Sequence, residues 1–249
     1  MVKRIFPNSS DFENLSRLRT EGPAQANEYD YTGVVVRKPW GYEYLWHQNA
    51  AVAIWMLHLT AGSATSLHCH ARKRTSLIVM AGTVMCSTFD DRFLLGPGQA
   101  IVLESCVFHT TRAQSAAGAF VMEVETPPLK GDVLRYRDDF GRAGQGYEDA
   151  RQYSTSLSDF DHQPLQQIQH QGRVFSFKET RLQVRAYQSQ AEMADHLVPG
   201  AVIVPLLGKL SAGQKIVADI GEAIPATAPS LSRLPAVFPP VELLQIFLP

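Results

Sequence analysis

The chain has 249 residues, of which 45% are hydrophobic and 19% are charged, and its formal net charge is −1. A chain of this length can bury one large core or two smaller ones. Its near-zero net charge gives no general attraction to nucleic acid or to an anionic membrane. The first residues lack the apolar stretch of a signal peptide, and no apolar run reaches the roughly 18 residues of a membrane span. We therefore expect a soluble cytoplasmic protein that binds neither nucleic acid nor membrane.

The cysteines indicate the same compartment. Cys69, Cys86 and Cys106 are odd in number, widely spaced and form no C-x-x-C motif. This pattern favours free thiols in a reducing environment over a disulfide framework.

Residues 1–33 are polar and weakly patterned, and we predict an N-terminal arm. Ser10 and Glu13 have the spacing of a capping box, which predicts a short helix through Phe12, Leu15 and Leu18.

Residues 34–148 have the pattern of an all-β domain. Short β-rich segments recur at regular intervals, separated by glycine, proline and aspartate, with almost no helical periodicity. Many short strands with turn signals between them predict a sandwich or a barrel. The expected strands cover residues 53–59, 65–70, 76–80, 84–89, 100–103, 107–110 and 120–125.

Residues 149–170 are rich in glutamine, serine and aspartate and are predicted to be a linker, and residues 171–249 then repeat the first domain in outline. Residues 199–208 resemble 76–82, residues 221–224 align with 98–101, and residues 241–246 align with 120–125. We interpret the second half as a degenerate internal repeat.

Two histidines are spaced for a metal ion. Successive side chains of a strand alternate between its faces, so His68-Cys69-His70 places both imidazoles on one face. The motif runs Gly62-x5-His68-x-His70-x4-Thr75-x6-Gly82, and a second one follows as Gly98-x5-Glu104-x-Cys106-x2-His109. The alternative is a set of structural histidines. In the second half, Ala194, His196 and Ser232 fall at the positions of these histidines, and Ser189 reads as a helix start, so we expect no metal there.

The two motifs resemble the signatures of the cupin superfamily, whose fold is a double-stranded β-helix, or jelly-roll, barrel. This resemblance implies an all-β chain of two cupin barrels, the second degenerate. It also implies that His68, His70 and His109 bind a divalent metal ion, such as zinc, iron, nickel or manganese. Thr75 stands where the family has a glutamate ligand.

A narrower resemblance covers about residues 34–147. Lys38-Pro-Trp-Gly41, the histidine motif, and the stretch from Met122 through Gly131-Asp-Val-Leu-Arg135 to Asp138-Asp-Phe-Gly-Arg142 look like the cupin module of type II mannose-6-phosphate isomerases. The same module ends bifunctional mannose-1-phosphate guanylyltransferases. The resemblance implies a role in carbohydrate metabolism, a sugar or sugar-phosphate substrate and a homodimer.

The chain departs from that family at the predicted site. Loss of the carboxylate at Thr75 leaves neutral imidazoles and a more cationic metal site with open positions. Lys73 matches an arginine that the family is thought to use to hold the sugar phosphate, and Arg72 lies beside it. We take Lys73, Arg72 and Arg142 as predicted substrate-binding residues, against the alternative of a solvated charge run at a strand end.

Glu123 and Glu125 share a strand face with Val121 and are the predicted catalytic bases. Either one could instead be a replacement metal ligand or an exposed edge carboxylate.

These predictions lead to three hypotheses about the function of the protein. The leading hypothesis is a metal-binding bicupin that isomerises a sugar or sugar phosphate. The alternatives are a three-histidine iron(II) cupin dioxygenase and a non-catalytic sugar-binding protein whose site has decayed.

Overall fold

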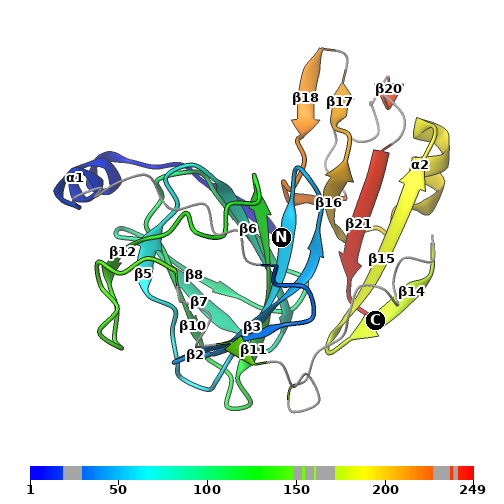
Figure 1. Cartoon of the computed structure of the whole chain (residues 1–249). Helices are drawn as coiled ribbons and strands as arrows, with labels where there is room; N and C mark the ends of the chain where they lie inside the picture. The colour runs from blue at the N-terminus through cyan, green and yellow to red at the C-terminus, as the bar shows by residue number, and fades with distance from the viewer. Residues whose placement is uncertain are drawn as a thin grey trace.

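The computed structural model describes residues 1–18, 30–147, 153–154, 160, 172–212, 214–226, 236–237 and 241–249. As predicted, the chain is all-β, with two helices, α1 (Ser9–Arg17) and α2 (Gln190–His196), within these described ranges. Figure 1 shows two groups of strands side by side, one from each half of the chain.

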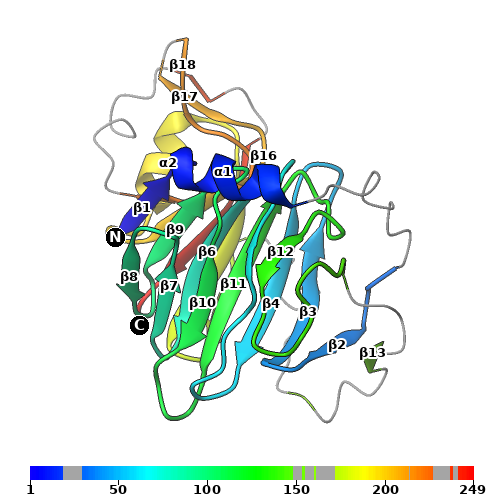
Figure 2. The same ribbon diagram turned by 90° about the vertical axis from the view of Figure 1, so that its left-hand side faces the viewer.

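The first half is built on an eight-stranded sheet. In order, its strands are β1 (Val2–Ile5), β9 (Ala100–Leu103), β6 (Arg74–Ala81), β11 (Ala119–Thr126), β4 (Ala53–Leu59), β3 (Gly41–Gln48), β2 (Val35–Lys38) and β13 (Tyr153–Ser154). Figure 2 shows this sheet with its strands in a row.

A second layer closes the first barrel. It contains β12 (Leu134–Arg137), β5 (Leu67–Cys69), β10 (Thr110–Ala113), β7 (Val84–Ser87) and β8 (Arg92–Leu95). Two isolated bridges, Ala64 with Arg112 and His68 with His109, join β5 and the segment before it to β10 and the residue before it. The order β9-β6-β11-β4 therefore faces the order β5-β10-β7-β8, which is the jelly-roll arrangement of cupin barrels.

The second half repeats this arrangement in degenerate form. One of its sheets has the order β14 (Val174–Phe177), β15 (Thr180–Tyr187), β21 (Val241–Phe247), β16 (Val202–Leu207) and β19 (Ile224–Pro225). The other has the order β18 (Lys215–Ala218), β17 (Leu210–Ala212) and β20 (Ala236–Val237). Thus β15-β21-β16-β19 corresponds to β4-β11-β6-β9, and α2 occupies the place in the chain that β5 has in the first half.

The helix explains the missing histidine pair in the second half. The side chain of Ser189 caps α2 by accepting a hydrogen bond from the N–H of Glu192, which confirms the predicted helix start. Ala194 and His196 lie exposed on this helix instead of on a barrel strand. Ser232 lies outside the described residues.

The internal repeat has a register that differs by one residue from the predicted one at the last strand. Leu77 pairs with Ile101 and Glu123, whereas Ile203 pairs with Ile224 and Gln245. Gln245 is therefore the counterpart of Glu123, where the sequence alignment had placed Leu244. A one-residue slip exchanges the two faces of a strand. The nearly continuous apolar pattern of this strand gave the sequence alignment no alternation to fix the register.

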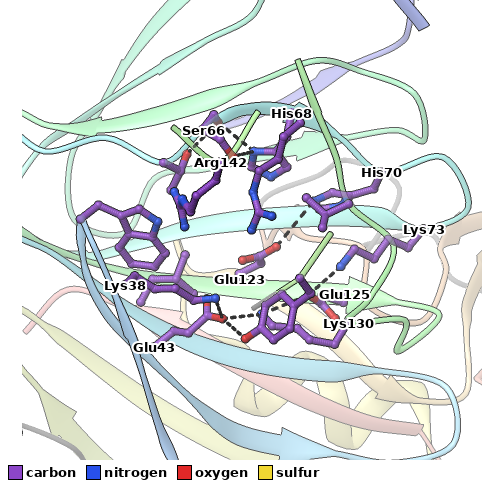
Figure 3. A pocket seen from close by; sticks show the side chains of 16 residues that line it. Lys38, Glu43, Ser66, His68, His70, Lys73, Glu123, Glu125, Lys130 and Arg142 are labelled. Carbon is purple, nitrogen blue, oxygen red and sulfur yellow. Dashed lines mark hydrogen bonds and ion pairs between the residues drawn. The ribbon is translucent and has the colours of Figure 1, made fainter. Parts of the chain in front are cut away.

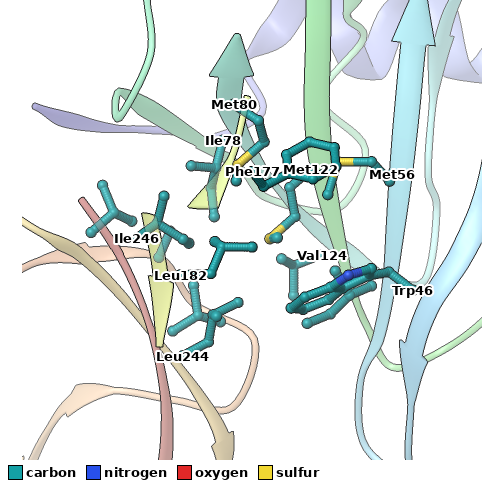
Figure 4. Packing of buried hydrophobic residues seen from close by; sticks show 14 of the residues in the cluster. Trp46, Met56, Ile78, Met80, Met122, Val124, Phe177, Leu182, Leu244 and Ile246 are labelled. Carbon is teal, nitrogen blue, oxygen red and sulfur yellow. The ribbon is translucent and has the colours of Figure 1, made fainter. Parts of the chain in front are cut away.

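The two halves pack back to back through their large sheets. Outward-facing Met122 and Val124 of the first sheet and Leu182, Leu244 and Ile246 of the second belong to one buried cluster (Figure 4). The inward faces of the same first-half strands fill the barrel core. Because both faces are buried, β4 is apolar except for His58, and β6 is apolar from Leu77 to Ala81.

The N-terminal segment is more than an arm. Strand β1 pairs in parallel with β9, and Leu15 of α1 packs against a cluster containing Cys69 and Phe108. The helix cap is also different from the predicted one. Asn8, not Ser10, is the N-cap and forms a capping box with Asp11.

Most of the predicted linker, residues 149–170, lies outside the described residues, although Tyr153–Ser154 pairs with β2 and extends the first sheet. The domain boundaries therefore stay a prediction. Within the described ranges, no helix has the length and apolar character needed to cross a membrane.

Candidate metal centre and adjoining pocket

Three histidines meet inside the first barrel. His68 on β5 and His109 before β10 exchange two backbone hydrogen bonds, with N–O distances of 3.0 and 2.8 Å. His70 follows one residue beyond the end of β5. The ring nitrogens of His68, His70 and His109 that could bind an ion all lie within 4.8 Å of one another. The structure thus brings together the three residues predicted as metal ligands.

Hydrogen bonds fix the orientation of each ring. The Nδ1 atoms of His68, His70 and His109 lie 2.8, 2.5 and 3.0 Å from the carbonyl oxygens of Ser66, Asp132 and Val107. Because a carbonyl oxygen can only accept, each Nδ1 carries the proton and each Nε2 presents a lone pair. A backbone carbonyl on the second nitrogen is typical of histidines that bind metal.

The protonation state suits a metal as well. Burial lowers the pKa of His109 to about 4 and lowers the pKa values of His68 and His70 well below their usual range. All three rings are therefore neutral at pH 7, as metal ligation requires. The buried Nε2 of His70 has no hydrogen-bond partner among the described residues. An imidazole donor set suits zinc, iron or nickel better than manganese.

A pocket that is partly open to solvent adjoins His68 and His70. Figure 3 shows His68 and His70 on one side of it, with Lys38 and Glu43 on the other. Ser66, Trp40, Arg135 and Tyr147 also line it.

The two predicted bases both point into this pocket. Glu123 and Glu125 lie on β11, are 8% and 1% exposed, and line the pocket. The alternative of exposed edge carboxylates is therefore wrong. Oε1 of Glu123 lies 3.8 Å from Nε2 of His70. Burial raises the pKa of Glu123 to about 7. The positive charge of Lys130 opposes this shift, and the negative charge of Glu125 adds to it.

The predicted basic cluster is divided by the structure. Lys73 is buried in the pocket, and its Nζ donates to Oε1 of Glu125 at 2.8 Å. Arg142 also lines the pocket and is held by Asp138, with a shortest contact of 2.7 Å. Arg72 does not reach the pocket, which corrects its predicted substrate-binding role. Its side chain is half exposed and lies 3.6 Å from Asp132.

The sequence did not predict a buried network of ion pairs that lies beside the histidines. Nζ of Lys130 lies 3.1 Å from Glu43 and 3.6 Å from Glu125, and Lys38 lies 3.3 Å from Glu43. The hydroxyl of Tyr147 donates to Glu43. Burial alone would raise the pKa of Glu43, but the charges of Lys130 and Lys38 lower it to about 2. Lys38 and Glu43 lie close in sequence on β2 and β3, but Glu125 and Lys130 come from β11 and the loop after it, so no local spacing predicted the whole network.

Asp132 also supports the site, and the sequence did not predict this. Its carboxylate accepts hydrogen bonds from the backbone N–H groups of Ala71, Arg72 and Lys73 at 3.3, 2.8 and 3.1 Å. Its carbonyl accepts from His70. Asp132 therefore fixes both the ring of His70 and the turn that follows it. Successive N–H groups around an oxyanion form the concave arrangement called a nest.

No family model matches the sequence, and no curated protein matches it. Several solved structures are similar. KdgF from Halomonas sp. is 16% identical over 36% of this chain and 82% of that one, with a TM-score of 0.34. A cupin-2 domain protein from Shewanella frigidimarina is 20% identical over 34% of this chain and 78% of its own, with a TM-score of 0.31. Rru_A2000 from Rhodospirillum rubrum, a cupin-2 domain, is 10% identical over 41% and 76%, with a TM-score of 0.36.

Proposed function

We propose that the first barrel is a metal-dependent active site for a small anionic substrate of the sugar class, a sugar phosphate, on which it performs an isomerase-type reaction. The observation that carries this proposal is the convergence of three neutral, oriented imidazoles beside a pocket of buried charges. The metal would be held by Nε2 of His68, His70 and His109.

The charges around the pocket favour an anion. Five cationic side chains line it against three carboxylates: Lys38, Lys73, Lys130, Arg135 and Arg142 against Glu43, Glu123 and Glu125. The surplus is two positive charges, or one when Asp138, the partner of Arg142, is included. A divalent cation on neutral imidazoles adds two more. A phosphate or carboxylate on the substrate would compensate this charge in a low-dielectric environment.

The residues of the chain have distinct roles in this proposal. A bound divalent cation would polarise a substrate carbonyl or hold two neighbouring oxygens. Lys73 and Arg142 present positive charge to the substrate, and Glu123 or Glu125 moves a proton between adjacent carbons. The sequence resemblance to the mannose-6-phosphate isomerase module supports a sugar phosphate as the substrate class. The cytoplasmic location and the homodimer stay predictions.

Binding and turnover of phosphosugars test this function. Protein loaded separately with zinc, nickel, manganese or iron is titrated with a panel of aldose and ketose phosphates in a calorimeter, and aldose–ketose conversion is followed by NMR. Unphosphorylated sugars serve as the ligand control and His70→Ala as the protein control. We expect binding and conversion of at least one phosphosugar that depend on metal. Failure of every phosphosugar to bind metal-loaded protein would overturn the proposal.

The two alternative functions give different results in the same samples. Oxygen uptake with iron but not with zinc would favour the dioxygenase. Sugar binding by protein that takes up no metal would favour the decayed, non-catalytic site.

A further inference from the structure

We propose that Glu123 is the fourth protein ligand of the metal centre, so that strand β11 supplies the carboxylate that β6 lacks at Thr75. This inference rests on the proposed metal site and extends it from three ligands to four.

The position of Glu123 fits a shared cation. Its Oε1 lies 3.8 Å from Nε2 of His70. Two ligand atoms of a tetrahedral zinc ion, each bound at about 2.1 Å, lie roughly 3.4 Å apart. The 3.8 Å between Glu123 and His70 is therefore close to the separation of two ligand atoms on one ion. Figure 3 shows Glu123 directed toward His70 across the pocket.

Glu123 also differs from the other pocket carboxylates in its partners. Glu43 contacts Lys38 and Lys130, and Glu125 contacts Lys73 and Lys130. Within the part of the chain that the structure describes, no hydrogen bond engages the Glu123 carboxylate, and the ionisable side chain close to it is the neutral imidazole of His70. A buried carboxylate is stable when it is paired or binds a metal. Of the three pocket carboxylates, Glu123 is the one placed to bind a metal ion.

The sheet register shows that β11 can supply the carboxylate that β6 lacks. Thr75 on β6 pairs with Glu125 on β11, and Leu77 pairs with Glu123. Thr75, Leu77, Glu123 and Glu125 therefore share the inward face of neighbouring strands. Thr75 is fully buried, and its hydroxyl has no hydrogen-bond partner among the described residues. A carboxylate absent from β6 is thus available from the adjacent strand of the same face.

The second half provides an internal comparison. Gln245, the counterpart of Glu123, is buried, and its Nε2 lies 3.1 Å from acceptors on Gln183, Tyr187 and His196. Where the histidine strand has become a helix, this position holds a neutral amide that joins strands to α2. The carboxylate occurs in the half that has the three histidines.

The proposal divides the roles of the two predicted bases. A ligated Glu123 lowers the net charge of a divalent centre by one. Glu125, which lines the same pocket and accepts a hydrogen bond from Lys73, is then the member of the pair that remains for proton transfer.

Metal affinity tests the assignment. Wild type, Glu123→Gln and Glu125→Gln are titrated with zinc and cobalt(II) in competition with a chromogenic chelator, and cobalt absorption spectra report the ligand set. We expect Glu123→Gln to lose at least about tenfold in affinity and to change the cobalt spectrum. Glu125→Gln, the matched carboxylate on the same face, should stay within about threefold of wild type. Equal affinity and an unchanged spectrum for Glu123→Gln would overturn the assignment.

A second measurement needs no variant. In a crystal structure of the zinc-loaded wild type, a Glu123 oxygen within about 2.2 Å of the ion supports the assignment, and a carboxylate beyond 3 Å overturns it. Zinc bound by the histidines without Glu123 would refute this inference and leave the proposed function standing. Absence of zinc binding by the wild type would refute both.

Discussion

Replacement of Asp132 is expected to weaken metal binding although its carboxylate bonds to backbone N–H groups and not to the histidine rings. The carboxylate holds the N–H groups of Ala71, Arg72 and Lys73, and the same residue accepts from His70 through its carbonyl. Without the carboxylate, the turn loses the contacts that place this carbonyl. His70 then has no fixed ring orientation before metal binds.

The structure sets the size of the effect and the order of the variants. A hydrogen bond to a charged group contributes roughly 1.5–3 kcal/mol, but three bonds to one carboxylate are not additive. We expect about 2–4 kcal/mol of destabilisation for Asp132→Ala. In Asp132→Asn, the remaining oxygen can turn toward Arg72 and Lys73 and keep the two shorter bonds. The amide then faces Ala71, so we expect about 1–2 kcal/mol.

Zinc affinity by chelator competition and urea unfolding of the metal-free protein measure the two effects separately. Metal affinity should fall roughly 10–100-fold in Asp132→Ala and less in Asp132→Asn. Asp139→Asn is the control, because Asp139 lies nearby in the chain on the surface, paired with Arg112 at 3.2 Å. If Asp132→Ala binds zinc as tightly as this control does, the positioning argument is refuted.

Three further predictions concern stability, each measured by chemical or thermal unfolding. Gly221→Ala should be clearly more destabilising than Gly200→Ala. Both glycines have positive φ, so the backbone strain is shared. The new Cβ would lie 1.8 Å from Thr126 Oγ1 at position 221, whereas at position 200 it would meet nothing within 4 Å. Equal losses would refute this clash between the halves. Met122→Ala, at a fully buried position between the two sheets, should cost about 2–5 kcal/mol, and a loss below 1 kcal/mol would contradict the packing described. Glu43→Gln should cost on the order of 3 kcal/mol at pH 7, because the pKa of Glu43 falls from 4.5 to about 2 on folding. A lowered folded pKa stabilises above pH 4.5, so the difference between this variant and wild type should shrink as the pH falls toward 2; a constant difference would contradict it.

The histidine motif could be recognised from sequence because its information is local. Alternation along a strand places His68 and His70 on one face, and the second motif brings His109 beside them. The same alternation placed Glu123 and Glu125 on one strand face with Val121. What the sequence did not decide was whether that face is buried, because this depends on strands β4 and β6 on either side of β11.

The errors have the same origin. Arg72 and Lys73 are neighbours, yet only Lys73 enters the pocket, because the turn held by Asp132 sends the two side chains in different directions. Lys130 and Glu43 meet from loop and strand positions far apart in the chain. The helix cap was assigned to Ser10 because its spacing to Glu13 is a standard pattern, but Asn8 forms an equivalent box with Asp11 two residues earlier.

The metal content of the protein tests the central claim most directly. Wild type and His70→Ala are purified without metal-affinity columns and analysed for zinc, iron, nickel and manganese. We predict about one equivalent of a divalent metal per chain in the wild type, retained through dialysis and lost in His70→Ala. No bound metal in either protein, together with no uptake of added zinc, would contradict a metal centre at His68, His70 and His109.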